Sequence, residues 1–507
     1  MKRASTTMKP FSIPHFPFSI SLAVLAGCAY LPSVGPSYEE PTREAESLAL
    51  PDAGYPTTNL TETCEYRPAD SNADCRVEIT DGELAEWWKK FNDPVLSDLV
   101  ESAITNNLSY VIAIKRLEQA NYELLGSYAA FLPKFGLGGG WAHHRYQDYS
   151  ASGGEATRYN AQNAALDGNW EIDIFGGSRR QTEAAFSLAE AALCDVADAW
   201  VALTTQLGSQ YVNLRTTQAR LEVARTNLVL QSETYDILRS RLDSGIGDEL
   251  AVNQCAYIVE QTRANIPQLL AQEERLKNAI AILAGKTPGE LEEALAPVKV
   301  RRDWLLSPQK ISDLPLDLLR GRPDVKSAER ALAAQTAYIG VAKAQWFPKL
   351  YISGQVGFKN ANGQRLFNKD SFFALLGPSV SWPIFQGGAI YANVKAAEAK
   401  VAQAAAQYEL VLDSAYGEVR DAYSAYTQEY HRYQSLKSAV KAATDAVTIS
   451  QDLYKNGLKD FNNVLDAQRS RLQLEEAYAV SRGQITLDLI SLYKALGGGL
   501  AVKSEKE

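Results

Sequence analysis

The chain has 507 residues, of which 46% are hydrophobic and 22% are charged, so its composition is that of a folded protein and not of a disordered one. Its formal net charge is −9, and it contains no run of five like charges. Proteins that bind nucleic acids need a basic surface, so this class is disfavoured. Only four histidines are present, which leaves a histidine-based metal site with few ligands, and we expect neither a metal nor a cofactor.

The first 27 residues have the pattern of a cleaved export signal. Three basic residues lie within positions 1–9, and an apolar stretch covers residues 18–26. This stretch is too short to span a bilayer, which needs roughly 20 residues. It ends in Leu25-Ala26-Gly27-Cys28, which resembles a bacterial lipobox. The resemblance implies that residues 1–27 are removed, that Cys28 carries lipid as the new N-terminus, and that the following alanine allows sorting to the outer membrane.

The remaining cysteines are interpreted for an exported protein. We expect residues 28–86 to form an extended N-terminal segment, in which Cys64 and Cys75 lie in a polar stretch. In an oxidising compartment this pair can close a small loop, which would stabilise the fold by about 3 kcal/mol in the chain-entropy model. Two unpaired surface thiols are the alternative. Cys194 and Cys255 fall in helical patterns and are expected to be buried.

The next 200 residues alternate between helical and strand patterns. A helical pattern covers residues 96–131 and ends at a Pro-Lys pair. Between about 134 and 172, apolar residues alternate with small or polar ones in two segments, which predicts two half-buried strands. A long helical pattern follows, breaks at Gly245–Gly247 and returns, which predicts an antiparallel helical hairpin.

The second half of the chain repeats the first. Three landmarks recur in the same order at offsets of 210 to 215 residues, namely Phe131–Phe135 as Trp346–Leu350, Ile174–Gly177 as Ile384–Gly388, and Arg241–Gly245 as Leu453–Gly457. Such agreement indicates a duplicated unit of roughly 200 residues. We therefore expect a first repeat over 87–300, a second over 301–499 with strands at about 349–384, and a polar C-terminal tail over 500–507.

The long helix of the second repeat has the periodicity of a coiled coil. From Val394 to Val447, apolar and aromatic residues recur every 3.53 positions on average, close to the coiled-coil value of 3.5. A single helix over residues 388–456 would be about 100 Å long. After a break at Gly457, residues 461–496 are expected to return as a second helix.

Four strands per chain cannot close a membrane barrel by themselves. The smallest single-chain barrels have about eight strands, and an open sheet edge cannot face lipid. Three chains would contribute twelve strands and enclose a lumen. A small soluble sandwich is the alternative, but it does not account for the leader, the long helices and the duplication together.

Three stretches carry a resemblance to a known family: Trp87–Leu96, Leu314–Val325 and Trp382–Gly388. With the repeat layout, they resemble the TolC-type outer membrane factors, specifically the lipidated NodT-like subfamily of drug efflux outer membrane lipoproteins. The resemblance implies a mainly α fold with transmembrane β-strands. In it, long antiparallel coiled-coil helices form a periplasmic tunnel, and a homotrimer shares a 12-stranded outer-membrane barrel.

The same resemblance implies the function and partners of the chain. It would be the exit duct of a tripartite efflux pump that passes drugs or other small molecules, working with a periplasmic adaptor (a membrane fusion protein) and an inner-membrane pump. A duct for type I protein secretion and one for metal-cation efflux are alternatives with the same fold. A purely structural envelope spacer is a third.

The resemblance also assigns sites. Gly245 and Gly457 would lie where the adaptor contacts the periplasmic tip, although both glycines also serve simply to end helices. Tyr454, Asp466 and Arg469 would belong to the periplasmic gate. Three copies of Asp466 would make a cation-selective ring, and Arg469 could pair with it on the same helix face.

The gate assignment has a plainer alternative and two departures. An exposed Asp466–Arg469 pair contributes under about 1 kcal/mol and can be an ordinary solvated pair. Ala251 and Asn463 stand where some members of the family have acidic residues, so this gate would carry fewer charges.

An enzyme is not expected. The Gly-Lys-Thr at residues 285–287 lacks the preceding glycine and strand of a phosphate-binding loop. The sequence also contains neither a G-x-S-x-G nucleophile elbow nor an H-E-x-x-H motif.

Overall fold

The computed structural model describes most of the chain, namely residues 33–39, 48–49, 74–79, 86–147, 156–297, 313–314, 319–361 and 365–505. Cys28 and Cys64 lie outside the described residues, and Cys75 is described in its backbone alone, so lipidation and the disulfide stay predictions. The chain divides into two compact units. Unit 1 comprises residues 1–39, 122–187 and 333–402, and unit 2 comprises residues 40–121, 188–332 and 403–507.

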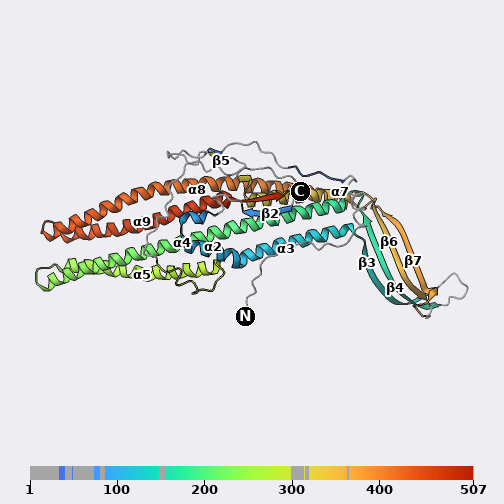
Figure 1. Cartoon of the computed structure of the whole chain (residues 1–507), viewed down its shortest axis with the longest axis horizontal. Coiled ribbons are helices and arrows are strands. Elements are labelled where there is room, and N and C mark those ends of the chain that lie inside the picture. The colour runs from blue at the N-terminus through green and yellow to red at the C-terminus, as the bar shows by residue number, and fades with distance from the viewer. Residues whose placement is uncertain are drawn as a thin grey trace. The chain divides into compact units, whose positions relative to one another are not determined.

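Long helices dominate the described structure (Figure 1). They are α2 (Pro94–Asn106), α3 (Leu108–Tyr128), α4 (Gly177–Asp243), α5 (Glu249–Leu283), α7 (Pro323–Ala344), α8 (Ala389–Lys455) and α9 (Phe461–Ala495). The duplication is visible in their lengths, because α4 and α8 both have 67 residues, and α5 and α9 both have 35. None of the described helices combines the length and the apolar character needed to cross a bilayer.

The helix expected over residues 96–131 is interrupted. Asn107 ends α2, where its N–H donates to the carbonyl of Ala103, and its side-chain oxygen accepts from the N–H of Tyr110 in α3 (3.1 Å). The side-chain amide of Asn107 also donates to the carbonyl of Leu283 (2.9 Å). One asparagine therefore ends one helix, caps the next and links both to α5, as its short polar side chain allows.

Four antiparallel strands form one sheet in the order β3-β4-β6-β7 (Figure 1). Their bounds are β3 (Lys134–Gln147), β4 (Ala156–Ile172), β6 (Lys349–Ala361) and β7 (Phe372–Ser381). The strand β7 stops at Ser381, before the expected limit of residue 384, because its partner β6 begins at Lys349, directly opposite Ser381. The central pair, β4 with β6, joins the two repeats.

Two short sheets involve other strands. β1 (Leu48–Ala49) pairs with β5 (Asp313–Leu314), and β2 (Asp74–Ile79) pairs with β8 (Leu500–Glu505). The C-terminal residues, expected as a polar tail, thus satisfy their backbone hydrogen bonds by pairing with a polar strand near the N-terminus.

The coiled-coil periodicity of α8 is confirmed. Every position of the apolar series from Val394 to Val447 is buried or half-buried. Small and aromatic side chains share this stripe, as Ala415 and Tyr426 illustrate, and both are buried in hydrophobic clusters.

The largest cluster of unit 2 is built around Trp87, which is fully buried. Its ring stacks on Tyr493 of α9 at 6.0 Å and meets Trp88 and Phe91 edge-on at 5.9 and 5.8 Å. Gly208 of α4 makes room for it, since a Cβ there would lie 2.4 Å from the indole. The residues Trp87–Phe91 form a 3-10 helix, η1, directly before α2.

A buried polar network supports the same cluster. Asp93 caps α2 by accepting from the N–H of Val95 (3.1 Å), and its second oxygen accepts from the hydroxyl of Tyr211 (2.8 Å). Arg215 donates to that hydroxyl (3.0 Å). Burial raises the pKa of Tyr211, so this phenol remains a neutral donor.

Arg322, within the second family-like stretch, joins three helices. Its guanidinium contacts Asp324 at the start of α7 (2.8 Å), Glu418 of α8 (2.9 Å) and the carbonyl of Ala495 at the end of α9 (2.8 Å). A buried cation with several partners fixes the geometry of all of them.

Candidate functional site

One face of the four-stranded sheet is apolar. Strand register aligns Leu137, Leu166, Val356 and Ala374 in one row, and side chains two residues away point to the same face. The neighbouring rows of this face hold Phe135, Trp170, Ile352, Leu376, Ile172, Leu350 and Val380. The predicted alternation is therefore confirmed, and many of these side chains are exposed in the single chain.

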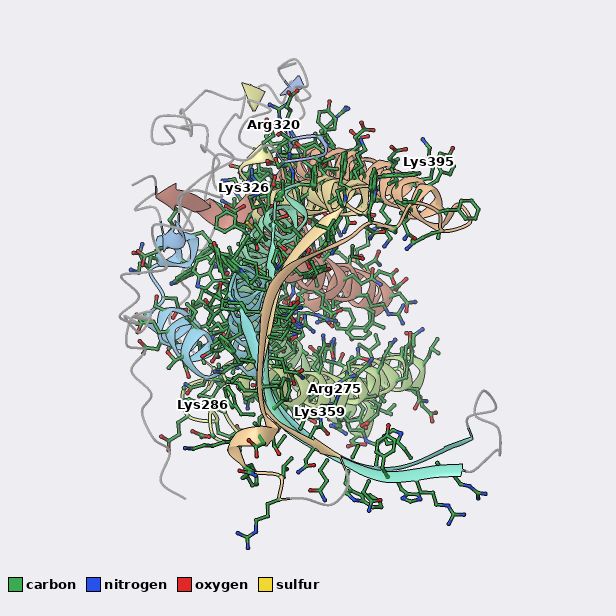
Figure 2. All side chains as sticks on the ribbon, turned by 90° about the vertical axis from the view of Figure 1, so that its right-hand side faces the viewer. Arg275, Lys286, Arg320, Lys326, Lys359 and Lys395 are labelled. Carbon is green, nitrogen blue, oxygen red and sulfur yellow. The ribbon has the colours of Figure 1, made fainter. Side chains whose placement is uncertain are left out.

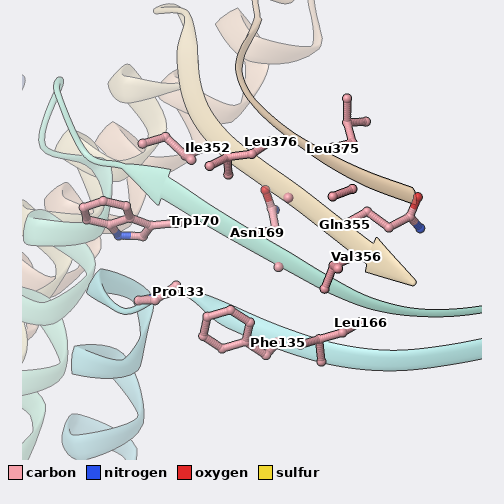
Figure 3. A pocket seen from close by; sticks show the side chains of 13 residues that line it. Pro133, Phe135, Leu166, Asn169, Trp170, Ile352, Gln355, Val356, Leu375 and Leu376 are labelled. Carbon is pink, nitrogen blue, oxygen red and sulfur yellow. The ribbon is translucent and has the colours of Figure 1, made fainter. Parts of the chain in front are cut away.

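A shallow hollow of about 520 Å³ lies on this face (Figure 3). At its centre Gly168 pairs with Gly354, and the side chains of Phe135 and Leu376 lean over these glycines from the outer strands. Large apolar groups around a hollow, without a covering element among the described residues, suit contact with hydrocarbon chains.

The opposite face of the sheet is small or polar on β3, β4 and β6, whereas β7 places Phe373 and Leu375 on it. Gln355 donates to Asp167, its neighbour across the ladder, and Ser353 bonds Asn169 (3.0 Å). Lys359 of β6 shares this face with Gln355, because an even number of positions separates the two along the strand. The other cations labelled in Figure 2 belong to helices and their connections: Arg275, Lys286, Arg320, Lys326 and Lys395. A wall with one apolar and one polar face separates lipid from water.

Tryptophans mark one end of the apolar face in both repeats. The indole N–H of Trp170 donates to the carbonyl of Phe131 (2.9 Å), and that of Trp382 donates to the carbonyl of Trp346 (3.1 Å). These are corresponding residues of the two copies. Amphipathic indoles at the limit of an apolar band are typical of a membrane–water interface.

The two helical hairpins turn in the same way. Gly245 (φ 76°) and Gly457 (φ 68°) adopt the left-handed conformation that favours glycine. In each turn the next residue donates back five positions, from Ile246 to the carbonyl of Arg241 (3.1 Å) and from Leu458 to that of Leu453 (2.9 Å). Both predicted glycine turns are therefore present.

Each turn also exposes one apolar side chain that the sequence did not single out. Ile246 is 73% exposed and Leu458 is 68% exposed, at corresponding positions directly after the glycines. In this type of turn the residue normally packs against its own helix. Its exposure in both copies suggests a contact surface.

Asp466 and Arg469 lie on one face of α9, as predicted, with 3.6 Å between their charged groups. The carboxylate is 76% exposed. The guanidinium of Arg469 also lies over the ring of Tyr257 in α5, 5.2 Å from its centre.

Tyr454 makes a separate pair of contacts. Its ring meets Phe461 edge-on at 5.3 Å, and the guanidinium of Arg241 lies over it at 5.3 Å. Through these contacts Tyr454, near the end of α8, is joined to the end of α4. The structure thus brings together residues of both hairpins, two of which the sequence analysis missed as members of the site: Tyr257 and Arg241.

Beneath these residues the two hairpins share an apolar cluster. It includes Ala251 and Cys255 of α5 together with Val464 and Leu465 of α9. Burial raises the pKa of the Cys255 thiol to about 11, so it is protonated at neutral pH and has little nucleophilic character. Ala251, where some relatives are expected to have an acid, is part of this packing.

Comparison with known proteins identifies the fold. The family model described as "Outer membrane efflux protein" matches residues 99–286 and 314–498. The chain belongs to this family. It is 31% identical over 456 residues to "Nodulation protein T" of Rhizobium leguminosarum bv. viciae, with 89% of this chain and 90% of that protein covered.

Two further relatives agree with this assignment. The "Outer membrane protein OprJ" of Pseudomonas aeruginosa is 29% identical over 417 residues, covering 81% of this chain and 86% of that protein. The solved structure described as "the outer-membrane channel OprN" has a TM-score of 0.79 at 32% identity, covering 92% of this chain and 99% of that one. The protein is therefore an outer membrane efflux channel, and the predicted family, fold class, function and location are confirmed.

The efflux channel also contains a polar ladder between α4 and α9 that the sequence analysis did not predict. Thr234, Asn227 and Arg220, spaced seven residues apart on α4, contact Gln468, Glu475 and Glu476 of α9 at 3.5, 2.8 and 3.8 Å. The heptad spacing on α4 is the signal that could have indicated it. Because α4 and α9 belong to different repeats, the ladder fixes the register of one hairpin against the other.

Proposed function

We propose that three copies of this chain form a twelve-stranded barrel in the outer membrane, continued by a helical tunnel in the periplasm. The observation that carries this is the sheet with one apolar face, one mostly small or polar face and two edges, β3 and β7, that are unpaired among the described strands. Unpaired backbone groups cost several kcal/mol each in hydrocarbon, so edges from neighbouring chains must pair.

The mass of the detergent-solubilised particle tests this assembly. Light scattering corrected for detergent should give three chains, and the particle should conduct ions in a planar bilayer. A monomer extracted without detergent would contradict the shared barrel. A trimer without conductance would support a structural spacer instead.

Cys28 is proposed to carry the lipid anchor. Mass spectrometry of the N-terminal peptide should find residue 28 first and acylated. A longer or unmodified N-terminus would contradict the anchor, and leave the trimer to be judged by its own test.

The channel is proposed to pass drugs or other small molecules delivered by an adaptor and an inner-membrane pump. Support comes from the "Antibiotic efflux pump outer membrane protein ArpC" of Pseudomonas putida, 26% identical over 487 residues. Loss of the chain should raise cellular sensitivity to such compounds. Export of proteins or metal cations remains the alternative. It is favoured if cells that lack the chain keep their normal sensitivity to such compounds but accumulate a protein or a metal cation.

The adaptor is proposed to dock on the hairpin turns, through Ile246 and Leu458. Replacing both with aspartate should abolish efflux by the complete pump, since a side chain that anchors an interface can contribute about 2 kcal/mol or more, and each new carboxylate would lose its hydration in the contact. Trimer yield and bilayer conductance should stay normal, because neither side chain is packed in the fold.

A matched control uses an exposed apolar residue away from the turns. Tyr122→Asp on α3 should leave efflux unchanged. Docking at the turns is contradicted if the double variant pumps normally, or if the control loses efflux equally.

The gate is proposed to involve Asp466, Arg469 and Tyr454, with Tyr257 and Arg241 as their partners. In a trimer, three Asp466 carboxylates would make a negative constriction that favours cations. Asp466→Asn should reduce cation selectivity in planar bilayers, and Tyr257→Ala should increase the fraction of time open by freeing Arg469.

Asp445→Asn, an exposed acid farther along α8, serves as the control for charge. Unchanged selectivity in Asp466→Asn, or an equal loss in the control, would remove Asp466 from the gate.

A further inference from the structure

Residues 33–39 lie against the junction of helices and strands in unit 1. The N–H of Val34 donates to the carbonyl of Phe175 (3.1 Å), and Arg180 donates to the carbonyl of Gly35 (3.3 Å). Arg180 is 6% exposed, and its guanidinium also bonds both oxygens of Glu183 (3.0 and 2.7 Å). Glu183 therefore holds the Arg180 guanidinium in the position from which it binds residues 33–39.

Glycines make this close contact sterically feasible. Gly35 has a φ of +108°, and a Cβ on it would lie 2.5 Å from the Cα of Gly340 in α7. A Cβ on Gly340 would lie 2.7 Å from the carbonyl oxygen of Val34 and 2.6 Å from Cγ of Arg180. We call these five residues, Val34, Gly35, Phe175, Arg180 and Gly340, the clasp. The backbones of residues 33–39 and α7 approach this closely because both residues in contact, Gly35 and Gly340, lack a side chain. A side chain at either position would push the two backbones apart.

The clasp lies where the sheet begins. Phe175 comes three residues after the end of β4, and Gly340 lies near the end of α7, just before β6. The same end of the sheet carries Trp170 and Trp382, which mark the interface. Unit 1 therefore holds an N-terminal segment at the rim of the apolar face.

The segment begins five residues after Cys28. Five residues reach at most roughly 17 Å when fully extended. A lipid on Cys28 is thus restricted to the neighbourhood of this rim for as long as the clasp is closed.

We propose that the clasp couples the lipid anchor to membrane assembly of the sheet, by holding the anchored N-terminus at the rim where the strands enter the membrane. This rests on the proposed lipidation of Cys28. A tethered sheet is concentrated at the membrane surface close to its site of insertion, which accelerates assembly. A flexible tether of greater length gives much less of this effect.

Two clasp variants, each in the full chain, test the coupling. Gly35→Val clashes with Gly340 and opens the clasp from the segment's side, without altering the helices. Insertion of a 20-residue Gly-Ser linker directly after Ala29 leaves the clasp intact but frees the lipid from the rim. Pro36→Val is the matched control, because residue 36 is adjacent and exposed.

Each variant is placed in two backgrounds, the lipidated chain and a Cys28→Ala chain exported by a signal of the non-lipoprotein type. Trimer formation is followed after pulse labelling, and the lipid is verified by mass spectrometry. In the lipidated background, Gly35→Val and the linker should both slow trimer formation on the order of fivefold, whereas Pro36→Val should not. In the Cys28→Ala background all three should assemble equally, at the slow rate.

Equal slowing by Gly35→Val in both backgrounds would overturn the proposal, because the clasp would then act through packing alone. Normal assembly of the linker variant would also overturn it. A Cys28 without lipid would overturn lipidation and coupling together, and bilayer conductance of the trimer would still report on the channel itself.

Discussion

The cluster around Trp87 and the turns of the hairpins lie on the same helices, yet the first is stabilised by buried contacts and the second by exposed ones. Around Trp87, aromatic rings from η1, α4 and α9 exclude water, and Asp93, Tyr211 and Arg215 form a buried hydrogen-bond network. At the turns, Ile246 and Leu458 are exposed, and Asp466 pairs with Arg469 across 3.6 Å at the surface.

This difference separates the rigid part of the channel from the part able to change. Buried clusters resist local opening, whereas segments with few buried contacts open at low free-energy cost. Exposed ion pairs contribute under about 1 kcal/mol, so the contacts at the turns can exchange for others without loss of the fold. A docking surface and a gate need that property.

The largest expected effect is at Trp87. Trp87→Ala would remove a fully buried indole and should lower the free energy of unfolding by about 4 kcal/mol. The thermal midpoint of the purified channel measures it. Leu458→Ala, at an exposed turn, should leave the midpoint nearly unchanged. A similar loss in both variants would contradict the contrast between the two regions.

Backbone conformation at the turns should give a smaller effect. Gly457 has a positive φ and open space around it, so Gly457→Ala should cost about 1 kcal/mol through the left-handed conformation alone. Gly126, inside α3, also has open space but an ordinary helical φ. Gly126→Ala should stabilise by about 0.5 to 1 kcal/mol. If Gly457→Ala and Gly126→Ala shift the thermal midpoint in the same direction, the left-handed conformation of Gly457 does not determine the stability of the turn.

The sequence predicted regular features well and tertiary contacts poorly. The spacing of apolar residues in α8 and the alternation in β6 identified their buried or apolar faces, because each pattern is a direct consequence of helix or strand geometry. The break at Asn107 was missed, since its cause includes a bond to Leu283, 176 positions away. Tyr257 was missed as the partner of Arg469 because the contact depends on how α5 packs against α9.

The smallest expected effect tests a buried acid on α9 that lies between Ile485 and Leu489, two members of the cluster around Trp87. Asp488 is 8% exposed, and burial raises its pKa above the ordinary value of 3.8, with Glu429 adding to the rise and a hydrogen bond from Gln484 opposing it. Because the folded protein holds this proton more tightly than the unfolded chain, ionisation of Asp488 destabilises the fold as the pH rises through the raised value. Asp488→Asn should therefore raise the thermal midpoint at pH 7, and its advantage should vanish as the pH falls below 3.8, where the wild-type acid is protonated in both states.

Asp445→Asn, an exposed acid of α8, should have no such pH-dependent advantage. An Asp488→Asn midpoint that exceeds wild type equally at both pH values would mean that shape or hydrogen bonding, and not the buried charge, limits stability at this position.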